Sequence, residues 1–505
     1  MVGEGVVGDV ISAFTGAVNS VATQILNFVN LDATFWPLII VLLLFVGLYF
    51  TFKTKGVQFG MLKESCRLMF AGAKLSDIFG KKKAVSSFQA FCVSMGARVG
   101  IGNIAGVAAA LVAGGPGAVF WMWAFAIIGA ATSFVECTVG QIYKEKDEEG
   151  HYRGGPAFYI KNALGNKDLA KVTALMIIIA YPFLFTGMQA STITQSLVTA
   201  TGFQQWIVAI IVTILTAVII FGGIRRVAKV SSAIVPFMAV AYVVLCLILI
   251  IPNITLIPGM IVTIVQYAFG IQAFAGGAIG IVIMQGVRRG MFSNEAGIGS
   301  IPNVASSASV HHPVKQGLIQ SLGVYIDTLI VCSATAFVIL LCAGNSFISY
   351  MDYGTTKATL VQNVLGETFI GAWAPGIVAF FLFFFAFSSI IAYYFMGELN
   401  TKFLSKNPHA ITIFRILVVL VVLMACLISI DVVWDLGDLF MGIMAFFNLT
   451  ALVYIGKFAF EALDDYKKQR AAGVVDPHFK VSSLSDQTGV TCWDDERPEE
   501  EEFYT

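Results

Sequence analysis

The stretch VGIGNIAGVAAALVAGGPG, residues 99–117, decides the fold because it interrupts an apolar run long enough to cross a membrane. It contains six glycines, one proline and one asparagine. Glycine inside a helix costs about 1 kcal/mol relative to alanine, and an unwound turn in lipid leaves backbone polar groups unpaired. Such a segment persists only where protein, water or a ligand satisfies the exposed backbone.

The composition around this stretch is that of an integral membrane protein. Of the 505 residues, 57% are hydrophobic and 12% are charged, about half the charged share of a soluble domain. The apolar runs are long enough for helices that cross the hydrocarbon core, and the alternating pattern of a membrane β-barrel is absent. The net charge of zero provides no basic surface for nucleic acid. The eight cysteines show neither disulfide nor metal spacing.

Hydropathy predicts an all-α protein with eleven transmembrane helices, at 33–52, 84–112, 117–142, 171–200, 204–222, 230–251, 257–286, 316–343, 371–397, 410–430 and 432–457. One extra N-terminal helix precedes two blocks of five, and because five is odd, the second block has inverted topology. We therefore predict five regions: an extracellular amphipathic segment (1–32), the extra helix with a basic cytoplasmic segment (33–83), two inverted repeats (84–251 and 252–458) and a cytoplasmic tail (459–505). A second amphipathic helix is expected at 60–80.

Basic residues predict the orientation of these helices. Residues 1–32 contain no Lys or Arg, whereas 53–83 contains eight. By the positive-inside rule the first helix runs from outside to inside. Of the 31 basic residues, 29 then fall on predicted inner segments, including Arg288 and Arg289; Lys357 falls outside and Arg98 lies within a span. The N-terminus is expected outside and the C-terminus in the cytoplasm.

Two glycine clusters interrupt predicted spans at matching positions of the two repeats. The first comprises Gly96, Gly100 and Gly102, and the second comprises Gly270, Gly276, Gly277 and Gly280. Paired interruptions in inverted halves indicate a transporter with its binding site at the membrane midplane. The alternative is that these glycines only allow close helix packing.

A broken helix suits a zwitterionic amino acid. Free amide groups and the positive dipole end of a half-helix attract a carboxylate. Free carbonyl oxygens at the end of the other half bind Na⁺ or an ammonium group.

Several motifs resemble those of the alanine or glycine:cation symporters, the sodium/alanine symporter family. They are GARVGIGNIAGVA (96–108), GGPGAVFWMWAFAIIG (114–129), RGGPAFYI (153–160), RRGMFSNEAGIGSIPN (288–303) and YYFMGELNTKFL (393–404). Ala124 departs from a family preference for a larger aliphatic residue. The resemblance extends over residues 84–460 and implies the leucine-transporter fold with broken core helices one and six. On that likeness, 84–112, 257–286 and 371–397 are core helices one, six and eight.

The resemblance also implies a substrate site. The amides of Gly100, Ile101 and Gly102 would hold the substrate carboxylate. The second unwound stretch would face the ammonium group and the side chain; its predicted members are Ile271, Gln272, Ala273, Phe274 and Gly277.

The implied sodium site consists of neutral oxygens. It joins carbonyls of Gly96, Val99 and Phe385 to the hydroxyls of Ser388 and Ser389. The alternative for the two serines is a hydrogen bond back to their own helix. Asn103 matches a ligand of the second sodium site of this fold. There Arg98 replaces a small residue, so one sodium ion is expected rather than two.

Other polar residues in the spans carry separate expectations. Glu136 is expected to accept hydrogen bonds from the unwound helix six; proton coupling through a protonated carboxylate is the alternative. Asp327 is expected to be a structural hydrogen-bond partner, and Gln189 lies within reach of a substrate. Asn294 and Glu295 are expected on the inner side, as a gate or a structural turn.

Together these features predict sodium-coupled symport of small neutral amino acids, alanine and glycine, into the cell by alternating access. Na⁺ is the coupling ion, and the partners are the amino acid and the lipid of the plasma membrane. No enzyme activity is expected, and no GxxxxGK[ST] motif for ATP is present. Two alternatives remain: a proton-coupled transporter of another small solute on the same fold, and a gated ion channel, for which no ring of carboxylates is found.

Overall fold

The computed structural model describes residues 16, 19–71, 85–148, 150–270, 279–343, 358–428 and 433–495. Apart from two short paired strands, β1 (Glu145–Lys146) and β2 (Tyr152–Arg153), the regular structure is helical. The longest helices are α2 (Trp36–Lys53), α8 (Gly117–Ile142), α13 (Gly223–Ile250), α21 (Ala374–Leu404), α22 (Pro408–Leu427) and α23 (Val433–Ile455).

The remaining helices are shorter or join end to end. The α-helices are α3 (Val57–Gly60), α4 (Leu62–Ala71), α6 (Ser87–Arg98), α7 (Val107–Gly114), α9 (Pro156–Asn162), α10 (Lys167–Ile179), α11 (Thr186–Thr201), α12 (Gln205–Ile220), α14 (Ile257–Ala268), α15 (Ile279–Asn294), α16 (Ile301–Ala305), α17 (Pro313–Val324), α18 (Ser333–Ala343), α20 (Ala358–Gly366) and α24 (Lys457–Ala471). The π and 3₁₀ turns are η1 (Leu31–Phe35), η2 (Gly102–Gly106), η3 (Ala180–Phe185), η4 (Ile251–Leu256), η5 (Tyr325–Cys332), η6 (Gly371–Trp373) and η7 (Val481–Ser483).

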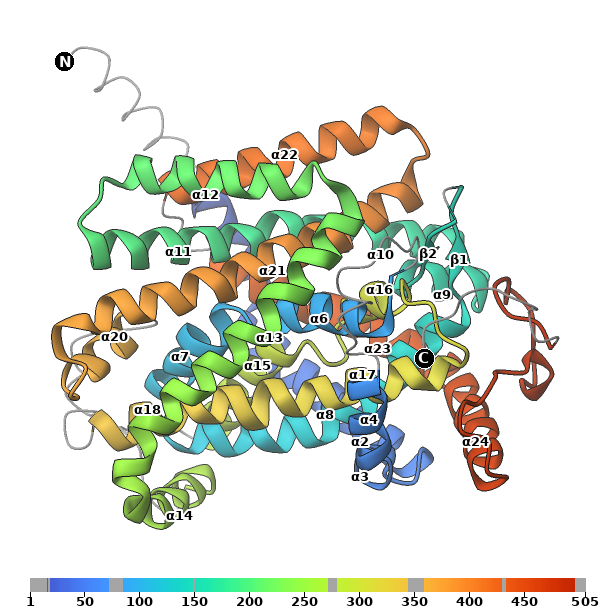
Figure 1. Cartoon of the computed structure of the whole chain (residues 1–505), viewed down its shortest axis with the longest axis horizontal. Coiled ribbons are helices and arrows are strands. Elements are labelled where there is room, and N and C mark those ends of the chain that lie inside the picture. Colours follow the sequence, from blue (N-terminus) through green and yellow to red (C-terminus); the bar gives the residue numbers. More distant parts are fainter. Residues whose placement is uncertain are drawn as a thin grey trace.

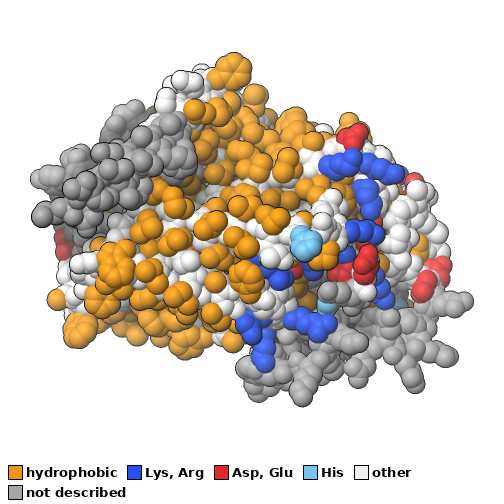
Figure 2. Space-filling model, turned by 90° about the horizontal axis from the view of Figure 1, so that it is seen from above, with side chains coloured by type: hydrophobic (Ala, Val, Ile, Leu, Met, Phe, Trp, Pro, Cys, Tyr) orange, Lys and Arg blue, Asp and Glu red, His pale blue; other side chains and the backbone are white. Residues whose placement is uncertain are grey.

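The chain is a multi-pass membrane protein. Eight described helices are long and apolar enough to cross a membrane, and the bent pair Ser87–Arg98 and Gly102–Gly114 makes a ninth span. Each of the nine overlaps a predicted span, but two extend further: Asn19–Lys53 includes residues predicted to lie in the extracellular segment, and Gly223–Ala268 runs from the predicted span 230–251 into 257–286. The predicted span 204–222 is a shorter apolar helix, Gln205–Ile220. Figure 2 shows apolar side chains over most of one face, with charged side chains gathered at one end, as a membrane-embedded surface requires.

Helix α8 packs against helices from several parts of the chain. It contacts α17, α15 and α2 most extensively. At 26 residues it is about 39 Å long, enough to cross the bilayer. On the other side of the bundle α11, α12 and α22 lie together, and α21 runs between them and α13 (Figure 1).

Four spans contain π-helical turns in place of a regular α-helix, at η1, η2, η3 and η5. In α10–η3–α11, Pro182 lacks the amide hydrogen that the helix ladder needs. The Thr186 hydroxyl donates to the carbonyl of Tyr181 at 3.0 Å. The span α17–η5–α18 holds Asp327 in its π segment.

The predicted span 257–286 is not one helix in the structure. Helix α14 ends at Ala268, whose carbonyl accepts a hydrogen bond from Trp121 Nε1 at 3.1 Å. A Cβ atom on Gly286 would lie 2.5 Å from the carbonyl oxygen of Ala118. Residues 268 and 286 therefore both lie beside the first turns of α8, so α14 and α15 are not two parts of one straight crossing. Gly270, which follows α14, has a φ of 69°, and residues 271–278 lie outside the described residues.

The charge-based orientation fails for Arg288 and Arg289. Arg288 Nη1 lies 2.8 Å from Asp32 Oδ1, and Arg289 Nη2 lies 2.5 Å from Asp438 Oδ2. The same prediction places Asp32 in the outer segment and Asp438 near the outer end of 432–457, where it is expected to be solvated. The structure buries Asp438 instead, and both arginines lie at the end of the bundle that holds these two aspartates. Buried ion pairing offsets their charge, which the positive-inside rule does not consider.

The opposite end of the bundle carries the tail. Helix α24, α9, α16 and the β1–β2 pair lie together there (Figure 1). After α24 the chain folds back: Phe479 N donates to the carbonyl of His311 at 2.9 Å, and Trp493 Nε1 donates to the carbonyl of Gln141 at 2.9 Å. The acidic end after 495 lies outside the described residues. Of the helix predicted at 60–80, α4 covers Leu62–Ala71, and residues 72–80 are likewise outside.

Candidate functional site

The first break in the bundle lies where the glycine-rich stretch predicts it. Helix α6 ends at Arg98, and the helix that resumes at Gly102 is bent from it by 45°. Two amides in the break point at side-chain oxygens: Gly100 N donates to Asn103 Oδ1 at 2.9 Å, and Ile101 N donates to Gln189 Oε1 at 3.1 Å. These amide oxygens occupy the positions expected for the oxygens of a carboxylate. The break therefore presents backbone donors to an acceptor.

A second break lies directly beside the first, between α15 and α16. Glu295, Gly297 and Gly299 have φ values of 56°, 83° and 87°, so the backbone cannot be helical there. Arg98 Nε donates to the carbonyl of Asn294 at 2.7 Å. A Cβ atom on Gly102 would lie 3.3 Å from the Cα of Ser293, a tight contact, so the two breaks are closely packed here.

Sequence reasoning assigned residues 294 and 295 no more than a gate or a turn. The signal that could have found the second break is the motif NEAGIGS (294–300) itself, which places two glycines and a polar pair directly after the apolar residues of α15. The predicted second stretch, with Ile271, Gln272, Ala273, Phe274 and Gly277, lies outside the described residues.

Glu136 braces the second break at Gly297, whereas the sequence prediction placed the backbone that it braces in the span 257–286. Its Oε1 accepts from Gly297 N at 3.2 Å, and its Oε2 accepts from Asn448 Nδ2 at 2.9 Å. Asn448 Nδ2 also donates to the carbonyl of Gly297 at 2.9 Å, and Asn448 Oδ1 accepts from the Tyr159 hydroxyl. Because Glu136 and Asn448 are both fully buried, this network holds the unwound backbone away from water.

Four residues of the predicted sodium site meet between α6 and α21. Ser389 Oγ lies 2.8 Å from the carbonyl oxygen of Gly96, and Ser388 Oγ lies 3.4 Å from it. Both hydroxyls also contact the carbonyl of Phe385, at 2.8 Å from Ser388 and 3.2 Å from Ser389. Each serine hydroxyl therefore contacts a carbonyl of its own helix α21, at Phe385, and also the Gly96 carbonyl of α6. No contact that places the Val99 carbonyl here is found among the described residues.

This donor set fits Na⁺. Two hydroxyl and two carbonyl oxygens are hard, neutral ligands, and all four residues are buried. Hard cations prefer such oxygens over nitrogen or sulfur. The coupling ion would find its ligands preassembled, with hydroxyl hydrogens that rotate away.

Asn103 lies in a different polar cluster. Its Nδ2 donates to Asp327 Oδ1 at 2.6 Å, and Asp327 Oδ2 accepts from the hydroxyls of Ser293 at 2.7 Å and Thr328 at 2.9 Å. Asp327 thus links the first break to α15, as a hydrogen-bond partner. Arg98 donates only to neutral acceptors among the described residues, which include Gln320 O and Ser133 Oγ.

Gln189 is more central than its sequence context indicated. Besides accepting from Ile101, its Nε2 lies 3.4 Å from the hydroxyl of Tyr393, which donates to the carbonyl of Ala97 at 3.2 Å. Tyr393 was not predicted, although it falls one turn after Ser389 on the same helix. Gln189 thus connects α11 to the first break, and Tyr393 connects α21 to the end of α6 beside it.

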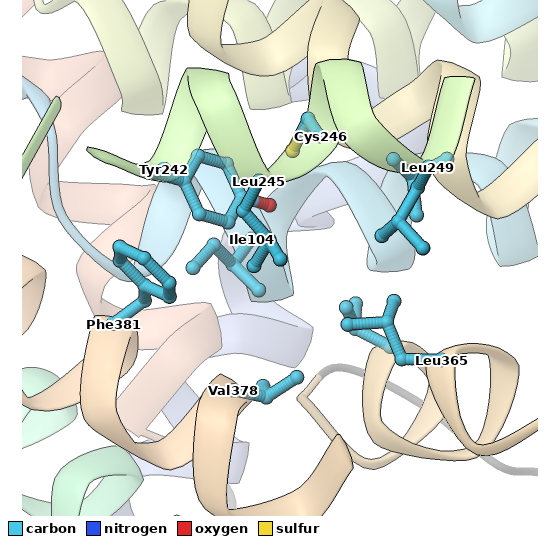
Figure 3. A pocket seen from close by; sticks show the side chains of 10 residues that line it. Ile104, Tyr242, Leu245, Cys246, Leu249, Leu365, Val378 and Phe381 are labelled. Carbon is cyan, nitrogen blue, oxygen red and sulfur yellow. The ribbon is translucent and has the colours of Figure 1, made fainter. Parts of the chain in front are cut away.

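A separate pocket lies between α13, α20 and α21 (Figure 3). Its lining is almost entirely apolar; the labelled residues are Ile104, Tyr242, Leu245, Cys246, Leu249, Leu365, Val378 and Phe381. The Tyr242 hydroxyl is already bonded to Thr335 Oγ1 at 2.7 Å. This pocket offers no charged partner for a zwitterion, so the breaks remain the candidate site.

Comparison with known proteins agrees with this geometry. Residues 19–481 match the model of the "Sodium:alanine symporter family". The probable sodium/glutamine symporter GlnT of Bacillus subtilis is 44% identical over 92% of this chain and 94% of its own length. The amino-acid carrier protein AlsT of the same organism is 43% identical over 94% of this chain and 98% of its own length.

A solved structure shows the fold. The crystal structure of MhsT in complex with L-phenylalanine superposes with a TM-score of 0.51 at 15% identity, covering 80% of this chain and 92% of that one. MhsT has the leucine-transporter fold, and at this identity the likeness concerns the fold alone. The match of the family model over nearly the whole chain, together with the two relatives, shows that this transporter, which is not an enzyme, belongs to the sodium:alanine symporter family.

Proposed function

We propose that this protein imports small neutral amino acids, alanine and glycine foremost, together with Na⁺ by alternating access. The observation that carries the proposal is the first break, where the amides of Gly100 and Ile101 face side-chain oxygens. The helix that leads into this break supplies the Gly96 carbonyl to the oxygen cluster of Ser388 and Ser389. A carboxylate replaces the oxygens of Asn103 and Gln189 at these amides. The Gly102 amide completes the set of donors.

The second break supplies the opposite face of the site. We place Asn294–Gly299 beside the substrate because Arg98 and Gly102 contact its first residues. Close backbone approach at the two breaks leaves little space, which favours alanine and glycine. The stretch 271–277 stays a prediction for the substrate side chain.

The proposed topology keeps eleven crossings, with the sixth core helix moved. The sixth core helix comprises α15, the second break and α16, in place of the predicted span 257–286. Helix α12 is the fourth core helix. The regions 1–32, 33–83, 84–251, 252–458 and 459–505 stand as proposed. In the plasma membrane the N-terminus is outside and the C-terminus is cytoplasmic. The position of β1–β2 and the tail at the same end of the bundle supports this orientation, because both are expected on the cytoplasmic side.

Alanine binding by the purified protein tests the function. Binding that requires Na⁺, and is lost when K⁺ or choline replaces it at fixed pH, is the expected result. Binding that is indifferent to Na⁺ but depends on pH would favour the proton-coupled alternative. Glutamine is a second candidate substrate, since a relative named as a sodium/glutamine symporter is 44% identical, and competition with alanine would detect it.

Ser389→Ala is expected to weaken Na⁺ coupling. Removing a hydroxyl that contacts a bound cation costs about 1.5–3 kcal/mol, so half-maximal alanine binding should need at least about tenfold more Na⁺. The measurement is a sodium titration of alanine binding. Thr401→Ala on the same helix removes a hydroxyl that bonds only to the Gly397 carbonyl, at 2.8 Å, and serves as the control. An unchanged sodium titration in Ser389→Ala would exclude this serine as a ligand.

A further inference from the structure

The C-terminal tail brings a second histidine against the loop that precedes α17. Gln469 on α24 holds the backbone of His478 on both sides: its Oε1 accepts from His478 N at 2.9 Å, and its Nε2 donates to the His478 carbonyl at 2.6 Å. The next amide, Phe479 N, donates to the carbonyl of His311 at 2.9 Å. These contacts fix the two histidines beside each other without using either imidazole ring.

Asp476 completes a cluster of three possible metal ligands with these histidines. The rings of His311 and His478 are stacked, with centroids 4.3 Å apart and planes at 23°, and Asp476 Oδ2 contacts His311 Nδ1. Each of the three residues offers one ligand atom, and these atoms all lie within 4.8 Å of one another. The side chains of His311 and Asp476 are 13% and 28% exposed, so a dissolved ion can reach the cluster. Pro477, between the two tail ligands, restricts the backbone that joins them.

This donor set suits a transition-metal ion of the Zn²⁺ type. Two imidazole nitrogens and one carboxylate oxygen are common zinc ligands, with a fourth position left for water. Bonds of about 2 Å to zinc place tetrahedral ligands about 3.3 Å apart, so small movements of the three side chains would close the cluster around an ion. Hard cations such as Na⁺ and Mg²⁺ prefer oxygen ligands, which separates this cluster from the oxygen cluster of Ser388 and Ser389.

Lys315 explains part of the cluster but not all of it. Its ammonium group contacts Asp476 Oδ1, whereas His311 contacts Oδ2 of the same carboxylate. Such an outer contact orients a ligating carboxylate, although the positive charge weakens the binding of a cation. The Lys315–Asp476 ion pair would fasten the tail without any histidine. It therefore does not account for two stacked imidazoles beside the same carboxylate.

We propose that His311, Asp476 and His478 bind one ion of the Zn²⁺ type, which fastens the C-terminal tail to the loop before α17. The ion takes the place of the hydrogen between His311 and Asp476, and that proton leaves to solvent. Helix α17 packs extensively against α8, and Trp493, further along the tail, donates to the Gln141 carbonyl at the end of α8. The bound ion therefore stabilises the docked tail on two helices of the bundle. The site does not depend on the proposed transport of Na⁺ and amino acid.

Zinc binding to the purified full-length protein, freed of affinity tags and treated with a chelator, tests this site. Titration against a chromophoric chelator is expected to show one Zn²⁺ per chain, with the affinity lowered at least about tenfold in His478→Ala because one ligand is lost. Excess Mg²⁺ should not compete. Zn²⁺ should also slow proteolysis of the tail after α24 in the wild type, but not in His478→Ala. His409→Ala is the matched control: this exposed histidine on α22 is outside the cluster, and its removal should change neither quantity.

Each further result supports or overturns the site. Co²⁺ in place of Zn²⁺ is expected to give the visible absorption of a tetrahedral site with nitrogen and oxygen ligands, which His311→Ala should remove. Zn²⁺ that binds His478→Ala and Asp476→Asn as tightly as the wild type would be an adventitious ion only, which refutes the site. A wild type that binds no Zn²⁺ would also refute it, while leaving the proposed transport untouched. Where an alanine variant does not fold, Lys315→Met keeps all three ligands and removes the competing charge. It should bind Zn²⁺ more tightly, and unchanged or weaker binding would contradict the proposal.

Discussion

Gly100→Leu is expected to abolish alanine binding while leaving membrane insertion intact. A Cβ atom at this position would clash with Ser389 Oγ and lie 3.0 Å from Gln189 Nε2. Further atoms of leucine would extend into the space between the Gly100 and Ile101 amides and their acceptors. Displacing Gln189 and Ser389 disturbs the carboxylate and the sodium positions at once. We expect at least a hundredfold loss of alanine affinity, about 2.7 kcal/mol or more.

The measurement is equilibrium binding of alanine to the purified variant, with size-exclusion chromatography to confirm that it is folded. Gly106→Ala is the control, because a Cβ atom there would meet nothing closer than 3.9 Å. It lies only one and a half turns along the same broken helix. If Gly100→Leu bound alanine like the wild type, the carboxylate position proposed at these amides would be incorrect.

Much of the fold follows from local sequence. Nine predicted spans overlap candidate spans because twenty apolar residues in a row have few alternatives. The first break was predictable since its glycines stand inside such a run, and the two adjacent serines on α21 supplied polar oxygens in an otherwise apolar helix. Apolar runs, glycine clusters and adjacent serines are each properties of one segment, so they can be recognised in the sequence alone.

Features that depend on contacts between distant segments were not predictable in the same way. The apolar residues of α14 (Ile257–Ala268) and α15 (Ile279–Asn294) follow one another closely in sequence and merge into one predicted span, although Ala268 and Gly286 both lie beside the first turns of α8. The second break begins at Glu295, a residue that rarely adopts a positive φ, so a search for glycine clusters alone does not find where it begins. Arg289 counted as an inner charge because its partner Asp438 is 149 residues away. The role of Gln189 likewise depends on Ile101, which lies 88 residues away.

Glu136→Leu is expected to have the second large effect, on stability and on transport together. The substitution leaves the amide of Gly297 and one Asn448 N–H without the acceptors that they now have. Each unsatisfied buried donor costs about 1–3 kcal/mol, so the unfolding temperature should fall clearly and alanine binding should be lost as the second break relaxes.

Glu136→Gln separates bracing from proton coupling. Glutamine keeps one acceptor oxygen but turns its NH₂ group toward a donor, either Gly297 N or Asn448 Nδ2. Asn448 cannot rotate to help, because its Nδ2 also donates to the Gly297 carbonyl and its Oδ1 accepts from Tyr159. Bracing therefore predicts weakened alanine binding at every pH, whereas a proton-carrying role predicts binding that is retained but no longer varies with pH. Thr138→Val on the same helix, which removes only a bond to the Phe134 carbonyl at 2.7 Å, should change neither stability nor binding by a comparable amount. Normal, pH-independent binding in Glu136→Gln would contradict the bracing role and assign this carboxylate to coupling.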